Sequence, residues 1–462
     1  MKKYIYILLS LISLTACTSD DMLMSNNTPT EATGHHRVAM RLIGQKQRFN
    51  DEATHTTRAT TTNWQVGDKI YINFNSSTKG TATYTSNGWV VEYDGAITTG
   101  EGQMCSARYF ENPKSVTDYL VQLDATSARY EAEGTYNYTG GELTLYLNLQ
   151  PATGRVRFKG TAGSKIYVAG PQFASSYTPS SNKLTEGLTT TTLTIDESGY
   201  TPYVYGTFLT IPMGSNEKST THFISVACGE NAYTRTCTDE VLSAGNSGYY
   251  TIPTETAHTG WRTGFTIRIK GYDFYEHDFK MMPVAGYTTG YFLLGETEVT
   301  SELYQTIMSH STNINYPNMP EYYISVNNWL TFINELNGVT GLNFYVPLKE
   351  EWDYAAQGGK LGQGCLYAGS NNVDDVAWTS ENASGNPNNV KTKLPNELGI
   401  YDMSGNVSEI VYYNTWKGYV HIGGSFYNNK EYATVQPTVF SSTMSINSSY
   451  NFVGLRLALR FN

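Results

Sequence analysis

The segment Leu394-Pro-Asn-Glu-Leu-Gly-Ile-Tyr-Asp-Met-Ser-Gly-Asn-Val-Ser-Glu409 joins an apolar pair to a dense polar run. Asp402, Gly405, Asn406 and Glu409 place two carboxylates, an amide and a glycine in one short loop. Oxygen donors spaced along a glycine-bent loop suit a hard cation such as Ca²⁺. A tight turn in which Asp402 and Asn406 bond to nearby backbone groups explains the same pattern. The spacing by itself leaves both interpretations open.

Three phrases accompany this segment: Phe344-Tyr-Val-Pro-Leu-Lys-Glu-Glu-Trp-Asp-Tyr-Ala-Ala-Gln-Gly-Gly359, Ile422-Gly-Gly-Ser-Phe426 and Val453-Gly-Leu-Arg-Leu-Ala458. Together with Gly295-Glu-Thr-Glu-Val-Thr300, they resemble the formylglycine-generating enzyme (sulfatase-modifying factor) family, a subgroup of the C-type-lectin fold. The resemblance covers about residues 277–462 and implies an α+β domain. Apolar residues at helical spacing predict core-facing helices around 325–336 and 349–357.

The same resemblance assigns roles within the loop. By analogy with the family, Asp402 and Glu409 provide side-chain oxygens to a structural Ca²⁺, and Gly405 and Val407 provide carbonyl oxygens. No other cofactor is expected.

Members of that family oxidise a substrate cysteine with copper held by two active-site cysteines. The matching positions here are Asn428 and Ala433, and neither side chain binds Cu(I), which requires thiolate. Cys365 lies outside those positions. The resemblance therefore predicts a domain that is not an enzyme.

Residues 427–451 are rich in Tyr, Asn and Ser and are bounded by framework phrases. Tyrosine provides contact area at low entropic cost, and Asn and Ser provide adaptable hydrogen bonds. We predict a surface that binds a glycan or a protein of a host or bacterial cell, formed by Trp416, Tyr427, Asn428, Asn429, Tyr432, Asn447 and Tyr450. A plain polar loop over the core is the alternative.

The whole chain has 462 residues, a net charge of −10 and few charged residues for its length. This length predicts two or three domains. The negative charge argues against a nucleic-acid partner, which requires a basic face. Abundant Tyr and Gly favour a β-rich secreted protein.

The first residues predict the compartment. Lys2-Lys3 precedes a short apolar run that ends in Leu14-Thr-Ala-Cys17, which resembles the lipobox of bacterial lipoproteins. Residues 1–16 are the predicted signal peptide, Cys17 the lipidated residue that anchors the chain to the membrane, and 17–37 a tether. Ser19-Asp20-Asp21 is similar to the export tag of Bacteroidetes surface lipoproteins, which implies outward display from the outer membrane. An ordinary signal peptide is the alternative.

Residues 38–258 show short alternating strands and polar turns, which predict all-β sandwiches. The first of these strands is predicted at 37–43. Arg58-Ala-Thr60 and the following Trp64-Gln-Val-Gly-Asp-Lys-Ile70 resemble the start of fimbrillin-type pilins of Bacteroidetes, whose sandwiches are transthyretin-like. We expect two sandwiches divided near residue 155, and a linker at 259–276 before the C-terminal domain.

That resemblance implies assembly with other fimbrial subunits by strand donation. A cut after Arg58 would free the first strand, and a strand from the next subunit would fill the vacated groove. The C-terminal strand at 453–459 belongs to the last domain, so the chain accepts a strand but does not donate one. This predicts a fimbrial tip adhesin. Arg48 is an alternative cut site, and a simple loop arginine without any cleavage explains Arg58 equally well. The alternative function is that of a stand-alone surface lipoprotein.

The remaining cysteines show no metal-site spacing. Cys228 and Cys237 flank a plausible hairpin, and an oxidising compartment permits a bridge between them. The sequence leaves that bridge undecided.

Overall fold

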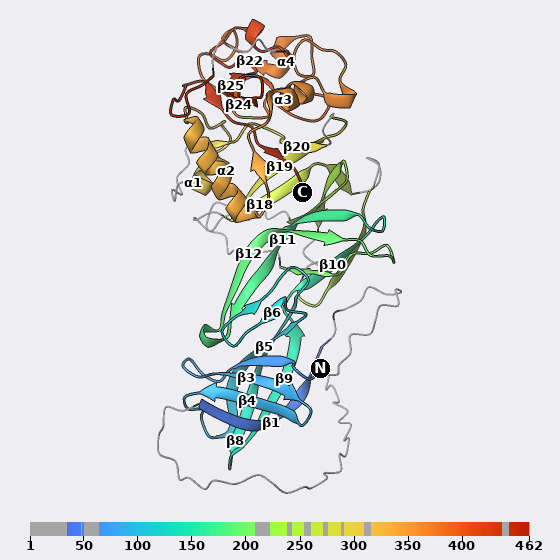
Figure 1. Cartoon of the computed structure of the whole chain (residues 1–462), viewed down its shortest axis with the longest axis vertical. Helices are drawn as coiled ribbons and strands as arrows, with labels where there is room; N and C mark the ends of the chain where they lie inside the picture. The colour runs from blue at the N-terminus through green and yellow to red at the C-terminus, as the bar shows by residue number, and fades with distance from the viewer. Residues whose placement is uncertain are drawn as a thin grey trace, which may run out of the picture.

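The chain folds into three bodies stacked along the long axis of the molecule, from the N-terminal strands at one end to the helices at the other (Figure 1). The computed structural model describes residues 35–47, 49, 64–207, 222–237, 243–253, 260–270, 276–287, 291–308, 316–436 and 443–461. Cys17, Arg58 and the predicted signal peptide lie outside these residues. Within the described ranges, no helix has both the length and the apolar character needed to cross a membrane.

The first body is a sheet that closes into a barrel in the order β1-β4-β3-β2-β5-β8-β9. Its strands are β1 (His35–Lys46), β2 (Lys69–Asn73), β3 (Lys79–Thr85), β4 (Gly88–Asp94), β5 (Gly100–Glu111), β8 (Ala128–Thr139) and β9 (Glu142–Pro151). Burial alternates along β9, where every second residue is a buried leucine. Buried aromatic rings such as Tyr130 and Tyr136 fill the interior.

Strand β1 closes this barrel. It pairs antiparallel with β4 and parallel with β9, and Met40 lies in the core. Gly44 has a φ of 147°, and a Cβ at this position would lie 1.5 Å from the carbonyl oxygen of Leu147. Only glycine fits so close an approach. The sequence predicted an all-β fold for this region, and the structure adds that the first strand joins both edges of the sheet and closes it.

The second body consists of two packed sheets. One has the order β13-β10-β16, and the other has the order β17-β15-β14-β11-β7-β6, with β12 paired to β11. The strands are β6 (Ser115–Val116), β7 (Val121–Gln122), β10 (Gly154–Lys159), β11 (Lys165–Thr178), β12 (Lys183–Thr194), β13 (Val204–Gly206), β14 (His222–Cys228), β15 (Asn231–Cys237), β16 (Ser247–Thr251) and β17 (Trp261–Thr263). Phe158, Phe173 and Val226 lie in the core between the sheets. The barrel ends at Pro151 and β10 begins at Gly154, close to the division predicted near residue 155.

The hairpin of β14 and β15 excludes the cysteine bridge considered above. Its register places Cys228 opposite Asn231 and Cys237 opposite His222. The two cysteines therefore lie at opposite ends of the hairpin, and both are free thiols. A disulfide needs Cα atoms within about 7 Å of each other, so this pair does not form one.

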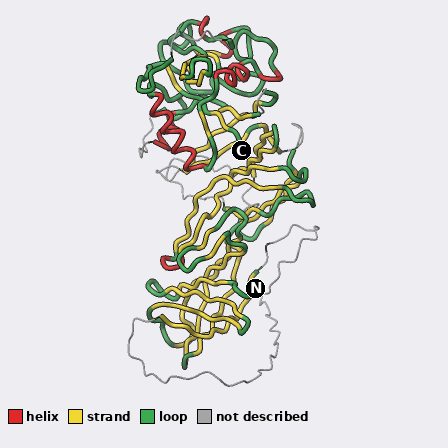
Figure 2. Tube along the Cα trace, viewed as in Figure 1, coloured by secondary structure: helices red, strands yellow, loops and turns green. Residues whose placement is uncertain are grey.

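The third body, which we call the head, contains helices and many loops around short strands (Figure 2). Its main sheet has the order β18-β19-β20-β27-β21, and two smaller sheets are β22-β23 and β25-β24-β26. The strands are β18 (Phe265–Lys270), β19 (Glu276–Val284), β20 (Phe292–Gly295), β21 (Phe344–Tyr345), β22 (Ala377–Trp378), β23 (Ser404–Gly405), β24 (Ser408–Tyr413), β25 (Gly418–Ile422), β26 (Val453–Gly454) and β27 (Ala458–Leu459). The helices are α1 (Ser301–Met308), α2 (Val326–Thr340), α3 (Lys349–Ala356) and α4 (Val373–Val376). The predicted order of classes, all-β bodies followed by an α+β domain, is confirmed.

The head and the second body share one apolar core. Ala169 and Ala227 of the second body belong to the same buried cluster as Trp329 and Leu457 of the head. The ring of Phe461 stacks on Tyr167 with 4.1 Å between ring centres. The segment 259–276, predicted to be a linker, instead carries β17, which pairs with β15, and β18, which pairs with β19. The boundary between the second body and the head is packed because β17 and β18 run through it.

Candidate functional site

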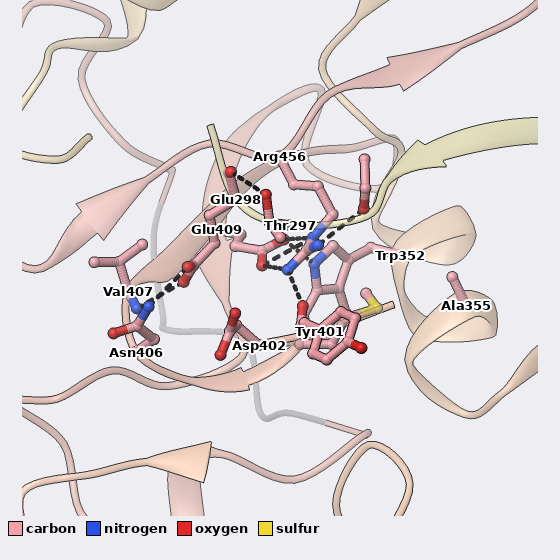
Figure 3. Close-up of polar contacts among 12 residues, drawn as sticks. Thr297, Glu298, Trp352, Ala355, Tyr401, Asp402, Asn406, Val407, Glu409 and Arg456 are labelled. Atoms are coloured by element: carbon pink, nitrogen blue, oxygen red, sulfur yellow. Dashed lines mark hydrogen bonds and ion pairs between the residues drawn. The ribbon is translucent and has the colours of Figure 1, made fainter. Parts of the chain in front are cut away.

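The head is organised around a buried ion pair, shown in Figure 3. Arg456 lies between β26 and β27, and its Nη2 lies 2.6 Å from Oε1 of Glu409 on β24. Both side chains are almost wholly inaccessible to solvent. The indole nitrogen of Trp352, on α3, donates to Oε2 of Glu409 at 2.6 Å. Arg456 also donates to the carbonyl oxygens of Gly295 and Tyr401, so this one guanidinium joins four segments of the head.

A second buried carboxylate, Glu298, supports the loop that follows Asp402. Its Oε1 accepts from the backbone N–H of Val407 at 3.0 Å, and its Oε2 accepts from Nδ2 of Asn406 at 2.8 Å. The loop is tightly bent, with positive φ at Asp402, Gly405 and Asn406. A Cβ on Gly405 would lie 2.3 Å from the carbonyl oxygen of Trp378, so glycine is required there.

Three buried carboxylates and one guanidinium give this cluster an excess of acid. Burial, followed by the negative charges of Asp402 and Glu409, raises the pKa of Glu298 well above its ordinary value. Burial also raises the pKa of Asp402 to about 6. The guanidinium of Arg456 stays charged because the neighbouring carboxylates raise its pKa despite burial. Arg456 therefore stays protonated, whereas one or more of the three carboxyl groups binds a proton more readily than an ordinary carboxylate does.

The predicted calcium ligands have unequal surroundings. Oδ1 of Asp402 is buried and has no hydrogen-bond partner among the described residues, which suits an oxygen that binds a cation. Glu409 uses both oxygens on Arg456 and Trp352. Over the same residues, no group of three or more His, Cys, Asp or Glu side chains could hold a metal. Binding through Asp402, Gly405, Val407 and Glu409 stays a prediction, and it requires Glu409 to give up one of its present contacts.

Asn428 and Ala433, the positions that the resemblance matches to the family's active-site cysteines, make packing and hydrogen-bonding contacts. Asn428 accepts from the hydroxyl of Ser425 at 2.6 Å, and its backbone carbonyl accepts from the N–H of Ser380. Ala433 is fully buried against Tyr367 and Val376. Neither position presents a sulfur atom or a titratable group.

An aromatic group lies at the surface next to these positions. Tyr427 has 65% of its surface exposed, and its ring stacks on Phe452 with 5.9 Å between ring centres. Tyr450 lies 6.2 Å from Phe452 and 6.0 Å from His421 by the same measure. Burial lowers the pKa of His421 to about 4, so this ring is neutral at physiological pH. We call Tyr427, Tyr450, Phe452 and His421 the aromatic surface.

The other predicted ligand-binding residues are also accessible, but not all of them join this group. Asn429, Tyr432 and Asn447 are exposed, and Asn428 is half-buried. Trp416 is exposed at the turn between β24 and β25, where its ring contacts Tyr413 at 5.2 Å. The structure thus brings Tyr427 and Tyr450 together and gives Trp416 a different aromatic neighbour.

Sequence reasoning missed Glu298, Arg456, His421 and Phe452 as site residues. A signal existed for Arg456, because a charged residue inside the apolar run Val453–Leu459 requires a buried partner. Nothing near Phe452 or His421 indicated that two exposed tyrosines would rest on them. Their role depends on contacts between segments far apart in the chain.

The family model for the sulfatase-modifying factor enzyme 1-like domain matches residues 213–461, more than half of the chain. The chain belongs to the sulfatase-modifying factor enzyme 1-like family. The head is the C-type-lectin-fold part of this match, and the match also reaches back into the second body.

Among individual proteins, a Paenibacillus barcinonensis protein named Chaperone protein LppX is 44% identical over 99 residues. That alignment covers 18% of this chain and 34% of the relative, so the chain spans about a third of that protein's length.

Several solved structures are similar over part of the chain. Treponema denticola variable protein 1 has a TM-score of 0.34 and 22% identity, over 40% of this chain and 96% of that one. A candidate cell adhesion protein of Bacteroides ovatus has a TM-score of 0.28 and 10% identity, over 48% and 94%. The fimbrial anchor protein Mfa2 of Porphyromonas gingivalis has a TM-score of 0.22 and 10% identity, over 41% and 78%.

Proposed function

We propose that this member of the sulfatase-modifying factor enzyme 1-like family is a non-catalytic surface adhesin whose head binds a glycan or a protein. The observation that carries the proposal is the exposed ring of Tyr427, held parallel to Phe452 at 5.9 Å. A large exposed ring with a fixed orientation loses little entropy on binding, and such aromatic residues dominate binding energy at interfaces. Tyr450 and the exposed Asn429 and Asn447 add polar contacts nearby.

The absence of thiols at the family's active-site positions supports the non-catalytic role. Asn428 and Ala433 are uncharged and packed, and Cys365 lies in a different loop. Oxidation of a substrate cysteine needs a copper ion held by thiolates, and these residues do not provide them.

We further infer that the barrel accepts a strand from another fimbrial subunit after β1 leaves. Removal of β1 would expose unpaired edges on both β4 and β9, because β1 pairs with both. Unpaired edges flanking an apolar groove favour addition of a strand. A cut after Arg58 would permit this exchange.

The C-terminal end of the chain supports a position at the fibre tip. Strand β27 pairs with β20 on one side and β21 on the other, in the interior of the head sheet. Its residues Ala458 and Leu459 are fully buried. A strand so enclosed is unsuited to donation, which favours a subunit that accepts a strand. A lipid on Cys17 would hold the precursor at the outer membrane. The alternative to a fimbrial subunit is a stand-alone surface lipoprotein.

Two measurements test this proposal. The first compares the purified chain with its Tyr427→Ala/Tyr432→Ala variant for binding to immobilised cell-surface glycans and matrix proteins. We expect the variant to lose binding and keep its melting temperature, because both rings are exposed. Tyr119→Ala is the matched control, since Tyr119 is a highly exposed tyrosine in the second body. Equal binding by the double variant would refute the adhesin surface.

The second measurement is the N-terminal sequence of the cell-surface form. Processing after Arg58 should give a chain that begins at Ala59 and is attached to another subunit. Full-length chains lipidated at Cys17, with no attached subunit, would establish the stand-alone lipoprotein instead.

A further inference from the structure

The outer face of strand β10 carries a row of three cations. The strand reads Gly154-Arg-Val-Arg-Phe-Lys159, and alternate residues point to opposite faces of the sheet. Val156 and Phe158 are buried in the core between the two sheets of the second body. Arg155, Arg157 and Lys159 therefore share the face that points away from that core.

Tyrosines from the neighbouring strands flank this row. Tyr249 on β16 lies directly opposite Arg157, and Tyr203 precedes β13 on the other side. The guanidinium carbon of Arg157 lies 4.7 Å from the ring centre of Tyr200, 5.0 Å from that of Tyr203 and 5.5 Å from that of Tyr249. Three aromatic rings thus surround one guanidinium, and all three tyrosines remain partly accessible to solvent.

The last two cations of this row, Arg157 and Lys159, form no ion pair within the described ranges, although Arg157 contributes, after hydrogen bonds from Ser198 and Tyr200, to a lowered pKa of Asp196. Over the same residues, Nε of Arg157 is buried without a hydrogen-bond acceptor. The nearby carboxylate of Asp196 accepts instead from the hydroxyl of Ser198 and from the backbone N–H of Tyr200. Arg155, by contrast, is buried and donates to Ser247 at 2.8 Å.

An unsatisfied guanidinium donor is costly to bury, and an anion that accepts from it removes that cost. The chain as a whole carries a net charge of −10, so unpaired cations here are not a consequence of general basicity. Tyrosine rings beside a guanidinium provide flat surfaces for sugar rings and hydroxyls for their polar groups. The guanidinium fork itself matches a carboxylate.

We propose that Arg157, Lys159, Tyr200, Tyr203 and Tyr249 form a second binding site, for a carboxylate-bearing glycan chain. The guanidinium of Arg157 and the ammonium of Lys159 hold the carboxylates, and the tyrosine rings contact the sugar rings. This site lies in the second body and is independent of the aromatic surface of the head.

The experiment measures binding of polygalacturonate to the purified full-length chain, with neutral dextran as the comparison polymer. We expect binding to polygalacturonate only, weakening as salt increases. Arg157→Gln should reduce affinity about tenfold or more, because charge-assisted hydrogen bonds to a carboxylate are lost. Arg262→Gln is the matched control, since Arg262 is an exposed arginine of β17 in the same body. Its affinity should stay within about twofold of the unsubstituted chain.

Two further variants distinguish loss of the binding site from loss of folding and from binding by the head. Lys159→Gln changes an exposed side chain and should also weaken binding, even if Arg157→Gln lowers the melting temperature. Tyr427→Ala should leave polygalacturonate binding unchanged, which separates this site from the adhesin surface. Absence of polygalacturonate binding, or equal binding by Arg157→Gln and the control, would overturn the proposal. Binding of anionic lipid vesicles alone, lost in Arg157→Gln, would also overturn it and assign the face to a membrane surface.

Discussion

The barrel and the head are each completed by a terminal strand of the chain, but the two strands are held differently. Strand β1 closes the barrel from the N-terminal side, and most of its residues are exposed or half-buried. Strand β27 lies in the interior of the head sheet, with both residues fully buried. The comparison teaches that the first and last described strands differ in burial, although each completes a sheet.

The ion pairs next to these strands show the same contrast. Lys46, at the end of β1, lies 2.8 Å from Glu111, and part of the Glu111 side chain stays accessible. Arg456, just before β27, is wholly buried with Glu409. Loss of a partner leaves a charge in contact with solvent in the barrel, but leaves an unpaired charge inside the head.

The largest expected effect comes from breaking the buried pair. Arg456→Met should lower the free energy of unfolding of the head by about 3–5 kcal/mol, because Glu409 would remain buried without its guanidinium. Lys46→Met in the barrel should cost less, since Glu111 can be hydrated. Chemical denaturation in the presence of a chelator measures both. Equal costs for the two variants would contradict the proposed contrast.

A pH effect should follow from His421 beneath the aromatic surface. Burial lowers its pKa to about 4, so the folded head binds fewer protons than the unfolded chain between about pH 4 and 6.5. Stability should therefore fall as the pH drops, by roughly 3 kcal/mol between pH 7 and pH 4 from this group. The measurement is the difference in unfolding free energy between the unsubstituted chain and His421→Phe at each pH. A difference that does not change with pH would show that His421 is not buried in neutral form.

A smaller loss is expected for Gly44→Ala in β1. A Cβ there would meet the carbonyl oxygen of Leu147 at a backbone angle unfavourable to alanine. Strain of this kind costs about 1–3 kcal/mol, and β1 should separate from β9 more readily. Limited proteolysis should then release β1 faster while the head stays resistant. Gly88→Ala in the β3–β4 turn is the control, because it also has a positive φ but no atom near the added Cβ. Equal release of β1 by both variants would show that strain alone, without the clash, is responsible.

An effect about as large as that of Gly44→Ala concerns calcium. Extracellular sites often bind Ca²⁺ at about 10⁻⁴–10⁻³ M, so 10 mM Ca²⁺ should stabilise the head by about 1–3 kcal/mol relative to a chelator. Asp402→Asn should remove the increase, because it removes the ionised oxygen available to the cation. An unchanged melting temperature of the unsubstituted chain would rule out the predicted site.

Local sequence patterns predicted much of the fold. The expected helices at 325–336 and 349–357 correspond to α2 and α3, because apolar residues at helical spacing report which face is buried. The predicted strand at 37–43 lies within β1. Here apolar residues alternate with polar or small ones, so every second residue marks the face that is expected to be buried. Within the segment 259–276, the alternating residues 265–269 correspond to β18, whereas β17 is too short and too polar at its edges to be distinguished from a loop.

The candidate site was predictable only in part. The composition of residues 427–451 correctly indicated exposed tyrosines, because that stretch contains few aliphatic residues to bury. It did not indicate that Tyr427 rests on Phe452, or that Trp416 contacts Tyr413. These contacts depend on how β24, β25 and β26 assemble, which no local pattern records.

The sequence by itself determined the order of the bodies and the family of the head, because these depend on residue identity and short-range spacing. Tertiary structure decided which residues share an environment. It buried Glu409 against Arg456, joined the two edges of the barrel through β1, and set Arg157 among three tyrosines with no ion pair to the described residues. Each of these pairs residues that are far apart in the chain, and their energies depend on burial and distance, which exist only once the chain has folded.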